Sequence, residues 1–254
     1  MNRRGKIMKF LFRSFFILIF IVFANVSSKA QAILDLETGA VFTGYNDVQI
    51  PGDRGTRFSL KDQLTPDAEF FYRLRLSYTI KSRHTVSLLY APLETESEGR
   101  IAQDILFEEI LFLANSQLNG KYKFNSYRLT YRYDIVKKPN VEFGLGLTAK
   151  IRDAQISMAS EGLYAEKDNV GFVPLINFRL LWDINDQFGL LLDGDALAAP
   201  QGRAEDISLA ATYRLSETLS VRLGYRILEG GADNDEVYNF ALFHYGLAGI
   251  SYTF

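Results

Sequence analysis

Apolar and polar residues alternate along most of this chain with a period of two. The clearest stretch is residues 72–80, where Leu74 and Leu76 alternate with Arg73 and Arg75. Successive side chains of a β-strand point to opposite faces, so the pattern predicts a strand with one apolar and one charged face. Arginines at every second position would be costly on a lipid-facing surface, and we therefore expect them to face an enclosed interior.

Ten stretches share this alternation, and the connections between them are long and short in turn. The expected strands are 33–45, 72–80, 86–90, 127–133, 141–152, 172–183, 188–195, 207–214, 219–226 and 245–254. The expected long loops are 46–66, 94–120, 161–169 and 229–239, and the turn at Pro200 is short enough to make the rim lowest there.

This arrangement predicts an all-β fold. We expect a single up-and-down antiparallel transmembrane β-barrel of about ten strands, with short periplasmic turns and longer external loops. A soluble β-sandwich also alternates, but it does not need so many lipid-type outer faces.

The last strand ends on an aromatic residue. Phe254, Tyr252 and Ile250 lie on one face, with Ser251 and Gly249 between them. A strand with a terminal Phe, and a Tyr two residues before it, resembles the assembly signal of bacterial outer-membrane β-barrel proteins. The resemblance covers essentially all of residues 31–254. It implies a Gram-negative outer membrane as the location, with Tyr252 and Phe254 as the assembly signal.

The same resemblance implies the partners of the chain. These are outer-membrane lipid and lipopolysaccharide around the barrel, and periplasmic chaperones and the barrel-assembly machinery during its insertion. The barrel is expected to be a monomer. No cofactor is implied.

The N-terminus has the pattern of a secretory signal peptide. A basic segment is followed by an apolar run at 14–26 and by Ser28-Lys29-Ala30, which offers small residues at the two positions that a signal peptidase reads. We expect residues 1–30 to be cleaved and residues 31–254 to form the barrel domain; cleavage after Ala32 is the near alternative. The apolar run is short for an uncleaved transmembrane helix, which needs about 20 residues.

Charge and cysteine content exclude several classes of function. Removing residues 1–30 takes away six of the 28 basic residues and no acidic one, which leaves 22 against 30 and a net charge near −8. An exported, acidic chain is a poor candidate for binding nucleic acid. The chain has no cysteine, so it forms no disulfides, thiolate metal sites or cysteine-linked lipid anchors.

The candidate functional residues are the charged side chains predicted to face the barrel interior. They are Arg73, Arg75, Arg128, Arg132, Lys150, Arg152, Arg179, Arg214, Arg222 and Arg226, with Asp35, Glu37, Glu142, Asp193, Asp195 and Asp206. A ten-stranded barrel is narrow, and unpaired buried charges are expensive, so we expect these residues to pair across the interior. That network would plug the barrel. The alternative is a narrow, basic-lined pore for small anions or solutes.

A catalytic site is the third possibility. Asp193 and Asp195 are two apart on one strand, and paired carboxylates can perform acid–base chemistry. Ten-stranded outer-membrane proteases use acidic and His residues at the outer rim. Here His84 lies near a periplasmic turn, the wrong end for that chemistry. His244 lies on the lipid-facing side of its strand, where outer-membrane lipid A deacylases pair a His with a Ser two residues later. In this chain that position is Gly246. We therefore name no catalytic residue and favour a non-enzymatic envelope or surface-interaction barrel.

Two loops carry further hypotheses. Residues 230–236 gather oxygen ligands but lack the spacing of a calcium loop, so a solvated acidic loop, with no metal, is expected. Residues 101–118 are very apolar for a surface loop. We expect the flanking strands to continue above the membrane and bury these residues; a lid folded into the mouth, or a patch for a lipid or partner, are the alternatives.

Overall fold

A computed structural model describes residues 31–200 and 202–254 of the chain. The expected signal peptide, residues 1–30, lies outside the described residues. The strands are β1 (Gln31–Gln49), β2 (Phe58–Ser59), β3 (Thr65–Pro66), β4 (Glu69–Ile80), β5 (His84–Ala91), β6 (Glu94–Arg100), β7 (Ile105–Phe107), β8 (Ile110–Phe112), β9 (Gln117–Lys138), β10 (Val141–Ser160), β11 (Leu163–Asp183), β12 (Phe188–Ala199), β13 (Gly202–Arg214), β14 (Leu219–Asp233) and β15 (Tyr238–Thr253). In the described part of the chain, no helix has the length and apolar character needed to span a membrane.

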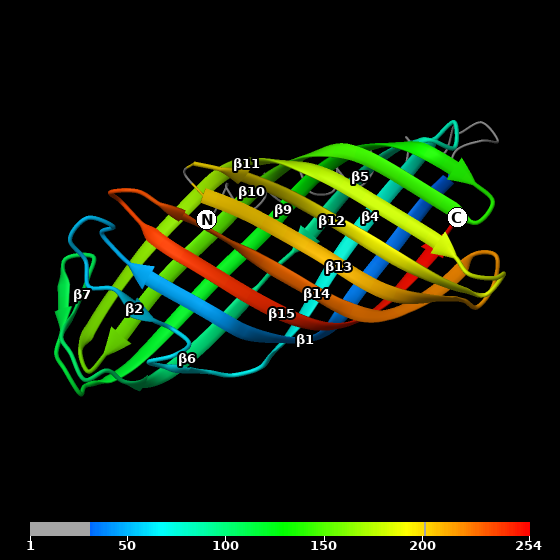
Figure 1. Ribbon diagram of the computed structural model, residues 1–254. Helices are drawn as coiled ribbons and strands as arrows, with labels where there is room; N and C mark the ends of the chain where they lie inside the picture. Colours follow the sequence, from blue (N-terminus) through cyan, green and yellow to red (C-terminus); the bar gives the residue numbers. More distant parts are fainter. Residues whose placement is uncertain (1–30, 201) are drawn as a thin grey trace, which may run out of the picture.

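Ten of these strands close into one antiparallel barrel, as predicted (Figure 1). The ring runs β1, β4, β5, β9, β10, β11, β12, β13, β14 and β15, and β15 pairs with β1 from Ile33↔Thr253 to Gln49↔Tyr238. The backbone amide of Phe254 donates to the carbonyl of Ala32 at 2.9 Å, so the start of β1 and the last described residue meet at one end of the barrel. That end also carries the short turns and is the periplasmic end of the barrel.

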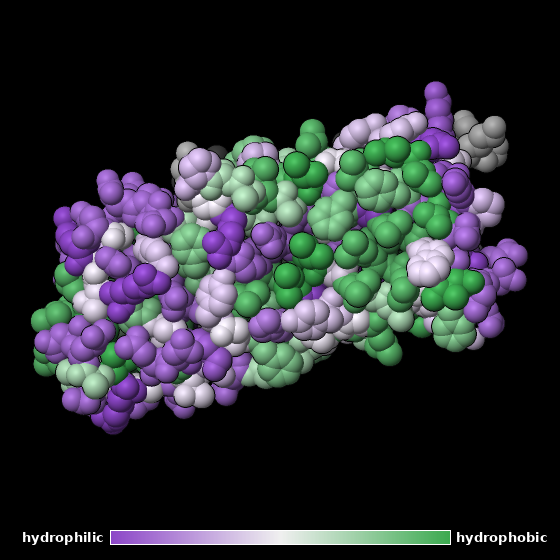
Figure 2. Space-filling view, in the orientation of Figure 1, coloured by the Kyte–Doolittle hydropathy of each residue, from purple (hydrophilic) through white to green (hydrophobic). Residues whose placement is uncertain are grey.

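An apolar belt surrounds the half of the barrel next to the periplasmic end. The side chains that alternate outward there are exposed, including Leu74 at 44%, Leu129 at 51% and Leu147 at 69%. In Figure 2, hydrophobic side chains gather over this half, whereas the opposite end is mostly hydrophilic. A belt of this kind is the lipid-facing surface of a transmembrane barrel.

The external parts of the strands are longer than the sequence predicts. The expected loop at 161–169 is wrong: β10 and β11 pair up to Ser160↔Leu163, which leaves only Glu161 and Gly162 in the turn. The loop expected at 229–239 shrinks to residues 234–237 because β14 and β15 pair as far as Asp233↔Tyr238. Beyond the lipid both faces of a strand tolerate polar residues, so backbone pairing continues where the apolar alternation stops.

The first and second long loops fold into a cap over the external mouth. β6 follows β5 along the same partner strand, β9, so the flanking strands continue above the membrane as expected for residues 94–120. β7 and β8 form a separate small hairpin. The hairpin is tied to the first loop by hydrogen bonds from Thr56 N to Leu106 O and from Glu108 N to Ile50 O, each 2.9 Å long. Residues 105–112 therefore form a lid over the mouth, which was one of the alternatives for this loop. Figure 1 shows β2 and β7 together at this end.

The interior of the external half is a hydrophobic core. Its fully or nearly fully buried residues include, from the wall, Val41, Val48, Tyr122, Ile156, Met158, Phe243 and Leu247, and from the cap, Phe58, Leu60, Leu64, Ile105, Phe107 and Phe112. The prediction of a polar interior is therefore correct only for the periplasmic half. Ordered loops need buried apolar area to offset the entropy lost on fixing them, and this core provides it.

The seam between β1 and β15 depends on a glycine. Gly39 has a φ of 147°, and a Cβ placed there would lie 2.0 Å from the carbonyl oxygen of Gly246. Gly39→Ala should therefore lower the free energy of unfolding by about 1–3 kcal/mol, the usual cost of a strained backbone position. Equilibrium urea unfolding in non-ionic micelles, followed by the fluorescence of the single Trp182, measures the change.

A matched control lies on the same seam. A Cβ at Gly246 meets nothing within 4 Å, so Gly246→Ala should leave the unfolding midpoint unchanged. Equal midpoints for the two variants would show that the close approach at Gly39 does not limit stability.

Candidate functional site: the charged centre of the lumen

The periplasmic half of the lumen is crossed by charged side chains from six strands. Alternation turns every second residue of each strand inward, so β1, β4, β9, β12, β13 and β14 all direct carboxylates or guanidinium groups at the same space. The central residues are Asp35, Glu37, Arg73, Arg75, Arg128, Asp193, Asp195, Asp206, Arg222 and Arg226. We call this set the charged centre.

Asp206 on β13 binds three arginines. Its Oδ1 accepts from Arg226 Nη1 at 2.5 Å, and its Oδ2 lies 2.9 Å from Arg73 Nη2 and 2.6 Å from Arg128 Nη2. The carboxylate is 2% exposed, so water contributes little to its solvation. Charged groups this deeply buried depend on their partners for stability.

Glu37 on β1 belongs to the same centre. Arg226 binds it in a fork, with Nε to Oε1 at 2.8 Å and Nη2 to Oε2 at 3.0 Å. Arg222 Nη2 also donates to Oε2 at 2.9 Å and reaches Asp35 Oδ1 at 2.8 Å. Such bidentate contacts fix geometry as well as charge. Together these bonds connect β14 to β1 over the intervening strand β15.

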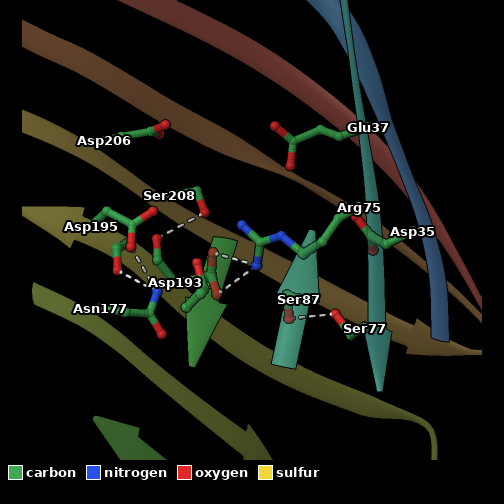
Figure 3. A network of polar contacts seen from close by, with 12 residues as sticks. Asp35, Glu37, Arg75, Ser77, Ser87, Asn177, Asp193, Asp195, Asp206 and Ser208 are labelled. Atoms are coloured by element: carbon green, nitrogen blue, oxygen red, sulfur yellow. Dashed lines mark hydrogen bonds and ion pairs between the residues drawn. The ribbon is translucent and has the colours of Figure 1, made fainter. Parts of the chain in front are cut away.

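Asp195 on β12 is held by both charged and neutral donors. Arg128 Nη1 lies 2.8 Å from its Oδ2, while Thr148 Oγ1 and Asn177 Nδ2 donate to its Oδ1 at 2.6 and 2.9 Å. Figure 3 shows Asn177 pointing to Asp195 from the neighbouring strand. The oxygens of this carboxylate are therefore all occupied.

Asp193 completes the set on the periplasmic side. Arg75 reaches it from β4, with Nη1 at 3.1 and 3.2 Å from its two oxygens (Figure 3). The charged centre thus contains five guanidinium groups and five carboxylates, in which the charges balance. A balanced, hydrogen-bonded network of this size fills a narrow barrel with side chains.

The other six predicted interior residues do not join this centre. Glu142 pairs with Lys137 at 2.6 Å, and Arg214 with Asp183 at 3.2 Å, both near the periplasmic turns. Arg132 pairs with Asp134 at 3.3 Å. The expectation that the interior charges pair across the lumen does not hold for these three, because their position near the turns offers closer partners.

The remaining three form no ion pair with any described residue. Arg179 lines the periplasmic opening. Arg152 donates to the side-chain oxygen of Asn169 near the external side. Lys150 is 2% exposed, and its ammonium lies 4.5 Å above the ring of Phe124. These cations stand at either end of the charged centre.

Several polar residues beside the charged centre were not among the predicted site residues. Asp134 is buried and has the same parity on β9 as Arg128 and Arg132, so alternation could have identified it. Asn177 and Thr148 are neutral. The alternation of side chains along their strands places them inside the barrel, but it does not indicate that they donate hydrogen bonds to Asp195.

A polar vestibule of about 490 Å³ lies below the charged centre, open toward the periplasmic end. Arg132, Arg179 and Arg214 line it together with Asp134 and Asp183. A path from this vestibule to the exterior would have to cross first the charged centre and then the apolar core under the cap.

The two histidines lie away from the acidic groups of the lumen. His84 Nδ1 is 2.8 Å from Tyr131 Oη, and His244 Nδ1 is bonded to Tyr225 Oη, both on the outer wall. Asp193 and Asp195 are each bound by arginine. Within residues 31–200 and 202–254, no group of three His, Cys, Asp or Glu side chains is arranged to hold a metal.

The acidic loop expected at 230–236 is largely strand and turn. Asn234 Oδ1 accepts the backbone amides of Glu236 and Val237, each at 3.0 Å. The backbone amide of Asp53 donates to Asp235 O at 3.2 Å, which joins this turn to the first loop. These oxygens support the turn and the cap.

The sequence matches no family model and no curated protein. Among solved structures, the outer membrane protease OmpT from Escherichia coli is similar over 91% of this chain and 99% of its own, with 10% identity and a TM-score of 0.57. The fold is that of a small outer-membrane β-barrel. The fold and the apolar belt together place the chain in the outer membrane, as predicted.

Two further solved structures match with lower scores. Ail, the attachment invasion locus protein of Yersinia pestis, is covered to 99% and this chain to 89%, with 10% identity and a TM-score of 0.41. An outer membrane channel from Pseudomonas putida F1 is covered to 97% and this chain to 91%, with 8% identity and a TM-score of 0.42.

Proposed function

We propose that this chain is a non-conducting, non-enzymatic outer-membrane barrel that acts through its external surface, as an envelope or surface-interaction protein. The observation that carries the proposal is the double closure of the lumen. The charged centre crosses the periplasmic half, and the apolar core beneath the cap fills most of the external half. A pore for hydrated ions needs a continuous aqueous path, and side chains fill that path at both of these levels.

The proposal extends to the biogenesis of the protein. Residues 1–30 would be removed as a signal peptide, and periplasmic chaperones would deliver the chain to the barrel-assembly machinery, which would read Tyr252 and Phe254. Both aromatic side chains face outward at the periplasmic end, and their rings contact each other at 4.9 Å. They are therefore accessible on the strand that closes the barrel.

Conductance of the refolded chain in a planar bilayer tests the closure. We expect no unitary current steps, because the charged centre leaves no continuous aqueous path. A variant in which a glycine linker replaces residues 102–114 sharpens the test. Asn115 N donates to Ile101 O at 2.8 Å, so the linker can join the two ends without disturbing β6 or β9. This variant should also be silent, because the charged centre remains.

A conducting porin in the same bilayer and the heat-modifiable gel shift of the folded chain are the controls. Stable steps from the intact chain would refute the closed barrel and favour the alternative, a narrow channel for small anions or solutes. In that event, neutralising Arg73 or Arg128 should change its ion selectivity. An enzyme acting on lipid or peptide finds less support, because the hydrogen-bond partner of each histidine, among the described residues, is a tyrosine on the outer wall and not a Ser, Thr or carboxylate.

A further inference from the structure

The barrel wall is incomplete between β11 and β12 on the external side. Their pairing ends at Ile176↔Ala196, although β11 continues to Leu163, and among the described strands it pairs there with β10 alone. β12 turns away after three more residues and pairs with β13 as far as Ala199↔Gly202. The edge of β11 beside this gap contains Pro174, a residue that edge strands tolerate because it has no amide to donate.

A cavity of about 430 Å³ passes through this gap. Phe172 and Arg203 have outward parity, yet they line the same cavity as the inward-facing Ile156 and Phe243. The cavity therefore runs from the outer surface of the wall into the external core. Its volume lies within the range of small-molecule binding sites, roughly 300–1,000 Å³.

The lining is predominantly apolar on both sides of the gap. Val173 and Pro174 of β11 face Leu197 and Ala199 of β12 across it, and Phe124 lies further inside. Phe172 is 65% exposed on the outer surface, next to the lipid belt. An apolar chain from the outer leaflet could thus enter without leaving an apolar environment.

A buried cation lies at the inner end of this cavity. Lys150 lines it, is 2% exposed, and forms no ion pair with any described carboxylate. The two acidic groups that act on it electrostatically, Asp195 and Asp206, are already paired with Arg128 at 2.8 and 2.6 Å. A buried charge without a counterion is costly, and an anion in the cavity would remove that cost.

Arg152 adds a second donor beside it. Its Nη2 is bonded to Asn169, but its Nε is buried without a partner. The other cations of the lining are neutralised, since Lys167 pairs with Glu108 at 3.2 Å and Arg203 with Glu229 at 2.7 Å. Unsatisfied positive charge is therefore concentrated on β10, at Lys150 and Arg152.

We propose that this cavity binds an amphiphile with one anionic head group and an apolar chain, which enters laterally between β11 and β12. Lys150 and the free N–H of Arg152 hold the head, and Phe124, Ile156 and Phe243 contact the chain. The proposal holds whether or not the lumen conducts ions, because the cavity opens through the wall and does not use the vestibule.

Equilibrium binding of radiolabelled oleate to the full-length barrel in non-ionic micelles tests the site, with empty micelles as background. We expect saturable binding of one oleate per barrel. Lys150→Met should weaken it about 10- to 100-fold, the range for one hydrogen bond to a charged group. Lys138→Met, at an exposed position near a periplasmic turn, removes the same charge and should bind as tightly as the unmodified chain.

Two further measurements separate the head from the chain. Oleyl alcohol, which has the same chain without the charge, should compete poorly with oleate. Ala154→Phe places a ring in the cavity and should abolish binding while the heat-modifiable gel shift shows a folded barrel. Absence of saturable binding to the unmodified chain would overturn the proposal. Equal binding by Lys150→Met, or equal competition by the alcohol, would overturn the assignment of an anionic head.

Discussion

Replacing Asp206 with asparagine should lower the free energy of unfolding by about 3–5 kcal/mol, the cost of removing one partner from a buried ion-pair network. Asp206 is bound to Arg73, Arg128 and Arg226, and it is almost fully buried. An amide in its place leaves the charged centre with one uncompensated positive charge. Urea unfolding from liposomes, monitored by Trp182 fluorescence, measures the loss.

A surface aspartate provides the matched control. Asp186→Asn, in an exposed periplasmic turn, makes the same chemical change and should alter stability by no more than about 0.5 kcal/mol. If Asp206→Asn cost as little as this control, the arginines around it would have to be solvated by water. The closed lumen proposed above would then lose its main support.

Phe107→Ala should release the cap while leaving the barrel folded. Phe107 is 0% exposed, and its ring meets Phe58 edge-on at 6.2 Å. Truncating a buried Phe to Ala costs about 3–5 kcal/mol. The cap is joined to the barrel mainly through this core, so the loss should appear as local opening, which hydrogen exchange detects. Faster exchange is expected at Thr56 N and Glu108 N.

The barrel supplies the internal reference for this measurement. Amides of β9 and β10 within the membrane belt should exchange at unchanged rates, and the overall unfolding midpoint should move little. Leu113→Ala, at a cap position that is 60% exposed, should leave exchange unaltered. Slow exchange at Thr56 N and Glu108 N in the Phe107 variant would show that backbone hydrogen bonds alone hold the cap.

The membrane-spanning part of the fold could be predicted from alternation alone. Where lipid lies on one side and packed charges on the other, each strand must carry two chemically distinct faces, as residues 72–80 do. That contrast sufficed to predict the ten-stranded barrel and the inward orientation of the arginines at alternating positions of its strands. The belt and the short turns follow from the same physical requirement.

The external parts were harder to predict because that contrast disappears above the membrane. Residues 163–169 are mostly polar and read as a loop, yet they form regular β-strand paired with β10. The apolar residues at 105–112 indicated burial, but their partners, such as Phe58, lie in another loop distant in sequence. Local patterns do not encode such long-range packing.

Side-chain parity also has a limit at the candidate site. It places Asp206 and Lys150 in the same lumen, but it does not say that one is bound by three arginines and the other has no counterion. That difference depends on the height of each residue along tilted strands and on which strands face each other across the barrel. Only the three-dimensional register supplies both.

The core beneath the cap has a consequence for how the exposed surface can vary. The shape of the cap is set by side chains hidden from solvent, such as Ile105 and Phe112, whereas exposed positions such as Arg57 and Gln103 contribute little to that packing. Substitutions at the exposed positions can therefore accumulate at small cost in stability. The chemistry of the exposed cap surface could therefore vary while the buried core keeps the shape of the cap constant.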